Sequence, residues 1–182
     1  LYLTAYNPLS IRAPYPMNIF FTNENPLLAA NDHCHIHTNK MIIEYAQILS
    51  AAHHILDGEN ALQGIYKKTH QNHPSAVWVR SGQYQYEWVL DCAVELCKMY
   101  TLRTGKVHKT EAVLNILKDL PDNLSVTAWK NPPVAAPDKF KAVAVFQGAA
   151  IAYQEYMKEK LAEWLTRDKP LKVEFLYTPE WI

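Results

Sequence analysis

A run of titratable side chains lies between Cys34 and Gln47, in a segment whose apolar residues recur with helical spacing. At about 100° per residue, Lys40 and Glu44 fall on one side of such a helix, next to its apolar face. Polar groups at the margin of a buried face are partly shielded from solvent, so neighbouring charges can shift their pKa values. This sector is a candidate site for a general acid, a general base or an amine nucleophile, and its polar members are His37, Lys40, Glu44, Gln47 and His54.

Glu44, Lys40 and His37 are the candidate catalytic residues of this sector. A carboxylate beside an amine is the pairing from which acid, base and nucleophile roles are built. A simpler interpretation is that Lys40 and Glu44, four residues apart on a helix, form only a surface ion pair. Both interpretations stay open at the level of the sequence.

A metal site is an alternative use of the same region. Cys34 and His37 are three residues apart, and His70 and His73 repeat that spacing, so the four side chains form a possible zinc ligand set. Against this, His73 precedes a proline, and a chain with eight histidines produces such spacings by chance. We therefore expect no cofactor and keep zinc as the alternative.

Aromatic and cationic residues alternate in the middle of the chain, as in proteins that stack bases and hold phosphates. Trp88 falls on an apolar stripe and is expected in the core, so the stacking candidates are Trp78 and Tyr86. The candidates for contact with DNA or phosphate are Arg80, Arg103, Lys106, His108 and Lys109, with His70 and His73 from the preceding segment.

Charge is balanced over the whole chain, with 18 basic and 18 acidic residues, but it is not evenly distributed. Residues 66–109 carry seven Lys and Arg against three acidic residues, whereas residues 24–59 carry one lysine against five acidic residues. A basic segment folded beside an acidic helix would give a phosphate-binding face next to a carboxylate-bearing pocket. Two ordinary solvated faces would give the same counts.

Several function classes are excluded by what the sequence lacks. It has no serine triad pattern, Walker loop, dinucleotide fingerprint or His-Asp pair, and five glycines leave little room for a phosphate-cradling loop. No apolar run is long enough to span a membrane, so we expect a soluble protein. Three cysteines, an odd number, fit a reducing compartment, and we expect the protein to be cytoplasmic.

The hydrophobic periodicity predicts an all-α fold, a single compact bundle of three to four main helices with long Pro-rich loops and an extended N-terminal segment. Phe20 and Phe21 form that extended stretch. The expected helices cover about 26–32, 38–56, a short helix that starts at 73–75, 83–104, 111–120 and 147–166, and the expected loops cover 59–72 and 121–138. Gly58 and Gly105 are expected to end the two long helices, and Ser81 and Thr110 to begin the helices that follow them.

Residues 1–16 carry prolines and tyrosines without periodicity and are expected to be an N-terminal extension, either native or added, ahead of a start at Met17. Residues 17–182 then form one helical domain, since a chain of this length normally builds one core.

Four segments in this order resemble small phage and bacterial proteins: Met17 to Ile19, Cys34 to Glu44, Tyr66 to Pro74 and Arg103 to Lys109. These proteins in turn resemble the endonuclease V-type pyrimidine-dimer DNA glycosylases. The resemblance runs from about Met17 to Trp164. It implies a compact all-α enzyme with a catalytic glutamate on its first long helix, and DNA contacts made by basic residues.

The resemblance implies that Glu44 takes the place of that glutamate, stabilising positive charge while an amine attacks C1′ of a flipped nucleotide. In that family the amine is the N-terminal one. Residues 1–16 would displace it here, and Asn18, which follows Met17, is not small, so Met17 would be retained. Lys40, one turn before Glu44, is the nearby substitute.

The leading hypothesis is therefore a DNA-directed base-excision enzyme, a glycosylase or lyase, or a related nucleotide-processing enzyme. The alternatives are a zinc-dependent hydrolase and a non-enzymatic phage accessory protein that binds nucleic acid or a host protein. The environment of Glu44 discriminates between them, because a buried carboxylate beside a cleft lined by Lys40 and His37 favours chemistry.

Overall fold

The computed structural model describes residues 18–182, and this part of the chain is all-α. Expectations for residues 1–16 and for a start at Met17 lie outside the described residues. The elements are α1 (Pro26–Asn31), α2 (His35–Leu56), the 3-10 turn η1 (Gly58–Asn60), α3 (Pro74–Val79), α4 (Gln83–Thr104), α5 (Glu111–Ile116), α6 (Asp138–Gln147) and α7 (Ala149–Thr166).

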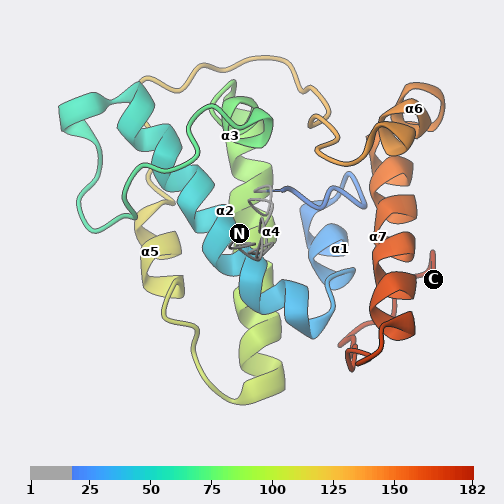
Figure 1. Cartoon of the computed structure of the whole chain (residues 1–182). Coiled ribbons are helices and arrows are strands. Elements are labelled where there is room, and N and C mark those ends of the chain that lie inside the picture. Colours follow the sequence, from blue (N-terminus) through green and yellow to red (C-terminus); the bar gives the residue numbers. More distant parts are fainter. Residues whose placement is uncertain (1–17) are drawn as a thin grey trace, which may run out of the picture.

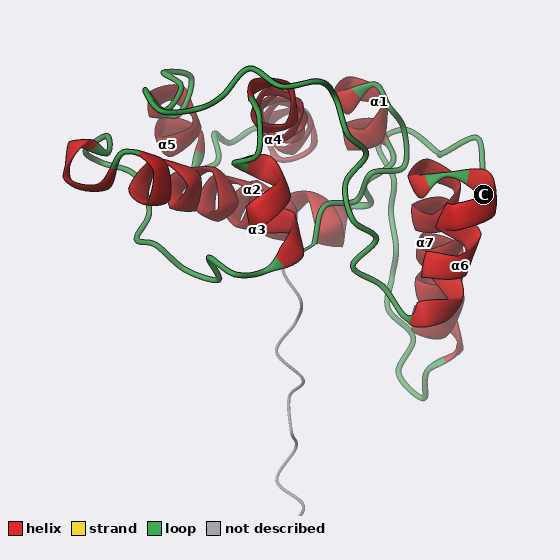
Figure 2. Cartoon of the chain, turned by 90° about the horizontal axis from the view of Figure 1, so that it is seen from above, coloured by secondary structure: helices red, strands yellow, loops and turns green. Residues whose placement is uncertain are grey.

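The two long helices α2 and α4 pack against each other and form the centre of the molecule (Figure 1). Helix α1 packs on α4, α3 packs on α2, and α6 and α7 pack together. Seen from above, the α6 and α7 pair stands to one side of α2 and α4 (Figure 2). The single compact domain therefore has a central pair of helices and a flanking pair.

Helix α2 begins at His35, three residues earlier than the periodicity predicts. Thr38 does not cap the helix, because its hydroxyl donates to the carbonyl of Cys34 at 3.0 Å, the i−4 contact made inside a helix. The end is as predicted: α2 stops at Leu56, and Gly58 follows with a left-handed φ of +57°.

Helix α4 has the predicted bounds and ends at Gly105, whose φ is +67°. Its N-cap is Gly82 and not Ser81, since the Ser81 hydroxyl donates to the carbonyl of Trp78 and closes α3 instead. Helix α5 ends at Ile116, earlier than expected. The carbonyl of Leu117, just beyond it, accepts a hydrogen bond from the Tyr86 hydroxyl at 2.9 Å.

The C-terminal third differs most from the prediction. The expected helix over 147–166 is confirmed as α7, but a further helix that was not predicted, α6, precedes it and is separated from it by Gly148 with φ +90°. Thr110 occupies the N-cap position of α5 without capping it, because its hydroxyl is paired with that of Tyr66 at 2.7 Å.

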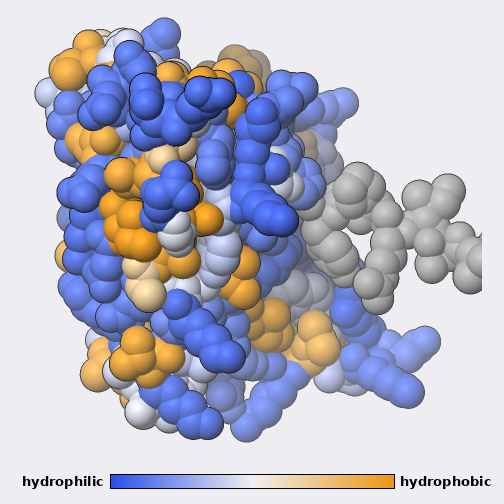
Figure 3. Space-filling model, turned by 90° about the vertical axis from the view of Figure 1, so that its left-hand side faces the viewer, coloured by the Kyte–Doolittle hydropathy of each residue, from blue (hydrophilic) through white to orange (hydrophobic). Residues whose placement is uncertain are grey.

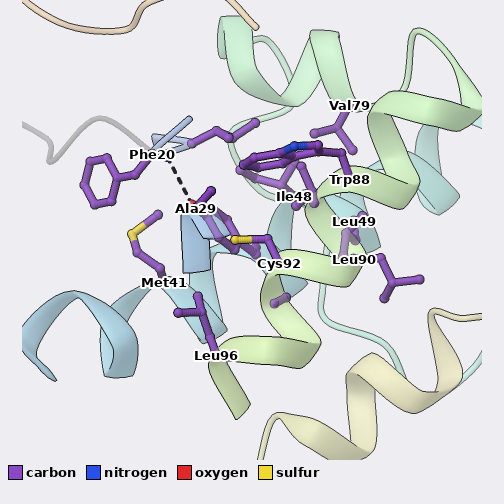
Figure 4. Close-up of a cluster of buried hydrophobic side chains, with 14 of the residues drawn as sticks. Phe20, Ala29, Met41, Ile48, Leu49, Val79, Trp88, Leu90, Cys92 and Leu96 are labelled. Carbon is purple, nitrogen blue, oxygen red and sulfur yellow. Dashed lines mark hydrogen bonds between the residues drawn. The ribbon is translucent and has the colours of Figure 1, made fainter. Parts of the chain in front are cut away.

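The core lies between α2 and α4 and extends to α7. Figure 4 shows part of this apolar cluster, which includes Met41, Ile48 and Leu49 from α2 and Trp88, Cys92 and Leu96 from α4. A second, smaller cluster joins Cys34 to Leu161 and Trp164 of α7. An isolated antiparallel bridge between Cys34 and Phe175 brings the C-terminal segment to the start of α2.

The surface is largely polar on the face that Figure 3 presents, with an apolar patch near its middle. Among the helices of residues 18–182, none combines the length and the apolar character that crossing a bilayer requires.

Candidate active site

Glu44 is a half-buried carboxylate held by one cation. Lys40 Nζ lies 3.2 Å from Glu44 Oε1, and the side chains are 40% and 15% exposed. Burial raises the pKa of Glu44, while Lys40, the backbone N–H of Asn18 and the imidazole of His70 act to lower it. Glu44 Oε2 is buried and has no partner at normal hydrogen-bond geometry among the described residues. The carboxylate is thus shielded and only partly satisfied, as expected of a functional group.

Asn18 is the residue that brings the N-terminal segment to Glu44. Its side chain is buried, with Nδ2 donating to the carbonyl of Ala135 at 2.8 Å. Its Oδ1 accepts from the hydroxyl of Tyr153 and from the backbone N–H of Ile19, each at 2.9 Å. These bonds connect the segment to the Pro-rich loop and to α7, so the N–H of Asn18 is fixed beside the carboxylate.

A cavity of about 520 Å³ opens between the first turns of α2 and the C-terminal half of α7. Lys40 and Asn18 line it, and both also act on Glu44, which does not itself line the cavity. The remaining lining residues are Phe20, Ile36, His37, Tyr156, Lys160, Glu163, Trp164, Arg167 and Leu171. A pocket of this size, with apolar walls and a few polar groups, suits a small organic ligand.

His37 is buried in the wall of this cavity. Its ring centroid lies 4.6 Å from that of Phe20 and 4.9 Å from that of Trp164. Burial lowers the pKa of His37 to about 2, and the charges of His33, Lys160 and Lys40 add to the effect. The imidazole therefore stays neutral at physiological pH and is no general acid, although Nδ1 has no hydrogen-bond partner among the described residues.

The basic end of α4 does not share this cavity. Arg103 donates to the Asn39 side chain at 2.7 Å. Asn39 and Glu44 are five residues apart on α2, which is about 140° around the helix. Arg103 and Glu44 therefore flank opposite edges of the exposed face of α2. Lys106 and Lys109 are exposed beyond the helix end, and His108 packs its ring against Tyr100.

The remaining phosphate candidates lie in the segment around α3. Arg80 Nη1 donates to the carbonyl of Gln71 at 2.6 Å, and His73 Nδ1 accepts from the N–H of Ser75 as the N-cap of α3. His70 has a positive φ of 47° and is exposed near Glu44. Of these three, His70 is the one that the structure brings to the carboxylate.

Both stacking candidates prove to be structural. Tyr86 is fully buried, with its hydroxyl 2.9 Å from His53 Nε2 and 2.9 Å from the carbonyl of Leu117. Trp78 is also buried, and its Nε1 donates to the carbonyl of Lys130. Neither ring is available to an external base, so this prediction is wrong.

The four possible zinc ligands do not come together. Within residues 18–182, no three His, Cys, Asp or Glu side chains are grouped so that they could hold a metal ion. Cys34 packs in the small apolar cluster with Leu161 and Trp164, and burial raises the pKa of its thiol. His73 caps α3. The proposed set Cys34, His37, His70 and His73 is therefore not a ligand set in this fold.

Sequence reasoning missed the contribution of α7. Tyr156, Lys160 and Trp164 recur every four residues and so lie along one side of that helix, where they line the cavity. The signal was the lysine within an aromatic stripe. The same stripe fits equally well a helix that buries Trp164 in the core.

Comparison of the chain with protein-family models, with curated proteins and with solved structures finds no match. The site is therefore interpreted from its own residues.

Proposed function

We propose that this protein cleaves the glycosidic bond of a nucleotide, most directly in DNA, with Glu44 and Lys40 as the reacting pair. The observation that carries the proposal is the shielded Glu44 carboxylate, paired with an amine at the margin of a cavity. Surface ion pairs of the helix i, i+4 type are normally solvated. This carboxylate is 15% exposed and has a raised pKa.

The pair supplies the groups that base excision needs. Lys40 gives a proton to Glu44, and its free amine then attacks C1′ of the sugar. The bond from C1′ to the base breaks with its electron pair going to the base, the base takes the proton from Glu44, and the carboxylate, negative again, stabilises the positive charge that develops on the sugar. Opening of the sugar ring breaks the C1′–O4′ bond and moves a proton from the attacking nitrogen to O4′. This gives a Schiff base between Lys40 and C1′, from which elimination cleaves the strand.

In this proposal a duplex binds along the exposed face of α2, between the two edges described above. Arg103, Lys106 and Lys109 at one edge supply positive charge for phosphates. Glu44, Lys40 and His70 lie at the other edge. An extended polyanion can reach both edges at once, whereas a single nucleotide cannot, and this favours a nucleic acid as the substrate.

The test is incubation of the protein with labelled duplexes that are ultraviolet-irradiated, uracil-containing or undamaged, with and without borohydride and chelator. It is run on the chain beginning at Leu1 and on one beginning at Met17, because an α-amino group at Met17 would be one residue from the N–H that acts on Glu44. We expect chelator-insensitive cleavage and a borohydride-trapped adduct.

Glu44→Gln should lower the rate by at least about a hundredfold. The matched control is Glu95→Gln, which removes a carboxylate that is 21% exposed and paired with Lys98 on the same helix, and should leave the rate unchanged. Absence of product and adduct on every duplex, or full activity in Glu44→Gln, would refute the proposal.

A further inference from the structure

We propose that the cavity between α2 and α7 binds a single nucleoside monophosphate unit, with the base against its apolar wall and the phosphate on Lys160 and Arg167. The inference rests on the proposed function and names the substrate unit that the site takes. It places the nucleotide beside the Lys40 and Glu44 pair.

The wall that would receive the base is largely aromatic and aliphatic. Phe20, His37 and Trp164 line it, and the His37 ring packs between the other two with centroid distances of 4.6 and 4.9 Å and interplanar angles of 49° and 52°. Half-buried Ile36 and Leu171 form its sides. Because these three rings are nearly buried, the apolar surface open to a planar heteroaromatic ring is mainly that of half-buried Ile36, Tyr156 and Leu171.

The cavity wall also carries an unused hydrogen-bonding atom. His37 is 2% exposed, and its Nδ1 has no partner among residues 18–182. A buried polar atom without a partner destabilises the folded state. Nδ1 is itself inaccessible, so a base edge meets this atom only if the His37 ring turns when the ligand binds. Because the ring stays neutral, it can act as donor or acceptor according to its tautomer.

Cations gather at the same cavity. Lys160 lies over the Tyr156 ring at 5.2 Å and forms no ion pair with any residue of the described part of the chain. Arg167 pairs at 3.3 Å with Glu163, whose side chain is 61% exposed. Lys40 also lines the cavity, but it is paired with Glu44, as Arg167 is with Glu163, so Lys160 supplies the excess positive charge. This excess favours an anionic ligand, and a guanidinium beside an ammonium suits phosphate.

The volume limits the ligand to one unit. About 520 Å³ is within the range of small-molecule pockets. The cations of α4 lie at the far edge of α2 and do not line it. The cavity therefore suits one nucleotide, either free or turned out of a strand, and the experiment has an arm for each source.

The test is calorimetric titration of the full chain with thymidine and adenosine 5′-monophosphates, thymidine, inorganic phosphate and a short single-stranded oligonucleotide. We expect the monophosphates and the oligonucleotide to bind, and thymidine and inorganic phosphate to bind at least tenfold more weakly. Lys160→Gln and Arg167→Gln should each weaken monophosphate binding about tenfold. Lys158→Gln is the matched control, because Lys158 lies on the same helix and pairs with Glu155 outside the cavity.

The inference is overturned if no monophosphate binds at millimolar concentration, if inorganic phosphate binds as tightly as the monophosphates, or if both cavity variants bind normally. Its failure is distinct from that of the proposed function. If duplexes are cleaved in a Glu44-dependent way but no monophosphate binds, the proposed function stands and the cavity is not the nucleotide site. If monophosphates bind but no duplex is cleaved, the cavity is a nucleotide site and the proposed glycosylase function is refuted.

Discussion

Glu44 differs from most ion-paired carboxylates of this protein in its surroundings. Asp138 and Glu174 also pair with lysines, but they are solvated, and hydrogen bonds from those lysines lower their pKa values. At Glu44, burial outweighs the effect of Lys40, so the pKa is raised. The pKa of a lysine-paired carboxylate is thus lowered where the pair is solvated and raised where it is buried.

Buried histidines should make stability depend on pH. Burial lowers the pKa of His33 from 6.5 to about 4, whereas an unfolded histidine titrates near 6.5. The unfolded state therefore binds this proton first as pH falls. Stability is full above about pH 7 and should drop between pH 6.5 and 4, by about 3 kcal/mol for this residue.

Urea unfolding at pH 7.5, 5.5 and 4.5 measures this slope. His33→Asn preserves a donor toward the carbonyl of Ala29, which His33 Nδ1 contacts at 2.8 Å, and removes the titration. The variant should show a shallower decline than the wild type over this range. Equal slopes in the two proteins would show that His33 is not the group responsible.

The sequence predicts positions around a helix better than it predicts burial. The placement of Lys40 and Glu44 next to the apolar face of α2 follows from helical spacing and is confirmed. The burial of Tyr86 and Trp78 could not be predicted, because it depends on partners more than 30 residues away, such as the carbonyls of Leu117 and Lys130. Aromatic residues beside cations have the same pattern in a binding face and in a core.

At the scale of elements, Asp57 connects the end of α2 to the start of the Pro-rich loop. Its carboxylate accepts hydrogen bonds from the backbone N–H groups of Asp122 and Asn123, at 3.1 and 3.0 Å, and from the Asn123 side chain. The side chain is 4% exposed. Three charge-assisted bonds to one buried carboxylate make it a strong local restraint.

Asp57→Ala should therefore lower the free energy of unfolding by about 2 to 3 kcal/mol, since two backbone donors lose their partner. Chemical denaturation checks this value. The control Asp122→Ala, at an exposed side chain that makes none of these bonds, should change stability by less than about 0.5 kcal/mol. Similar losses in both variants would show that the turn is held by other contacts.

The helices with a strong apolar stripe were predicted well, and α6 was not. Only Phe140 of α6 is buried, and Val145 and Phe146 are 80% and 86% exposed. A helix with one buried side chain leaves no clear periodic signal. It is defined by packing on α7, and α7 is in turn the helix whose cavity-lining residues the sequence did not reveal.

At the scale of the whole molecule, the charges separate into two regions on either side of the exposed face of α2. The cavity and Glu44 lie along one edge, and the basic end of α4 lies along the other. The uneven charge along the sequence suggested such a division, but the sequence did not show that the regions would be separate. The two regions should contribute to different properties of nucleic acid binding.

The double variant Lys106→Gln, Lys109→Gln should reduce the salt dependence of duplex binding by about two units in the slope of log K against log salt, because each lysine releases about one counterion. Monophosphate binding should stay unchanged. Fluorescence anisotropy with a labelled duplex at several salt concentrations provides the slope. An unchanged slope would mean that the duplex does not reach this end of α4.

The most direct test of the central claim is to locate the trapped adduct. After reaction with a damaged duplex and borohydride, peptide mapping by mass spectrometry identifies the amine that carries the sugar. The account predicts Lys40 in the chain beginning at Leu1, and Lys40 or the new α-amino group in a chain beginning at Met17, with no adduct in Glu44→Gln. An adduct on any other lysine, or one that survives Glu44→Gln, would contradict it.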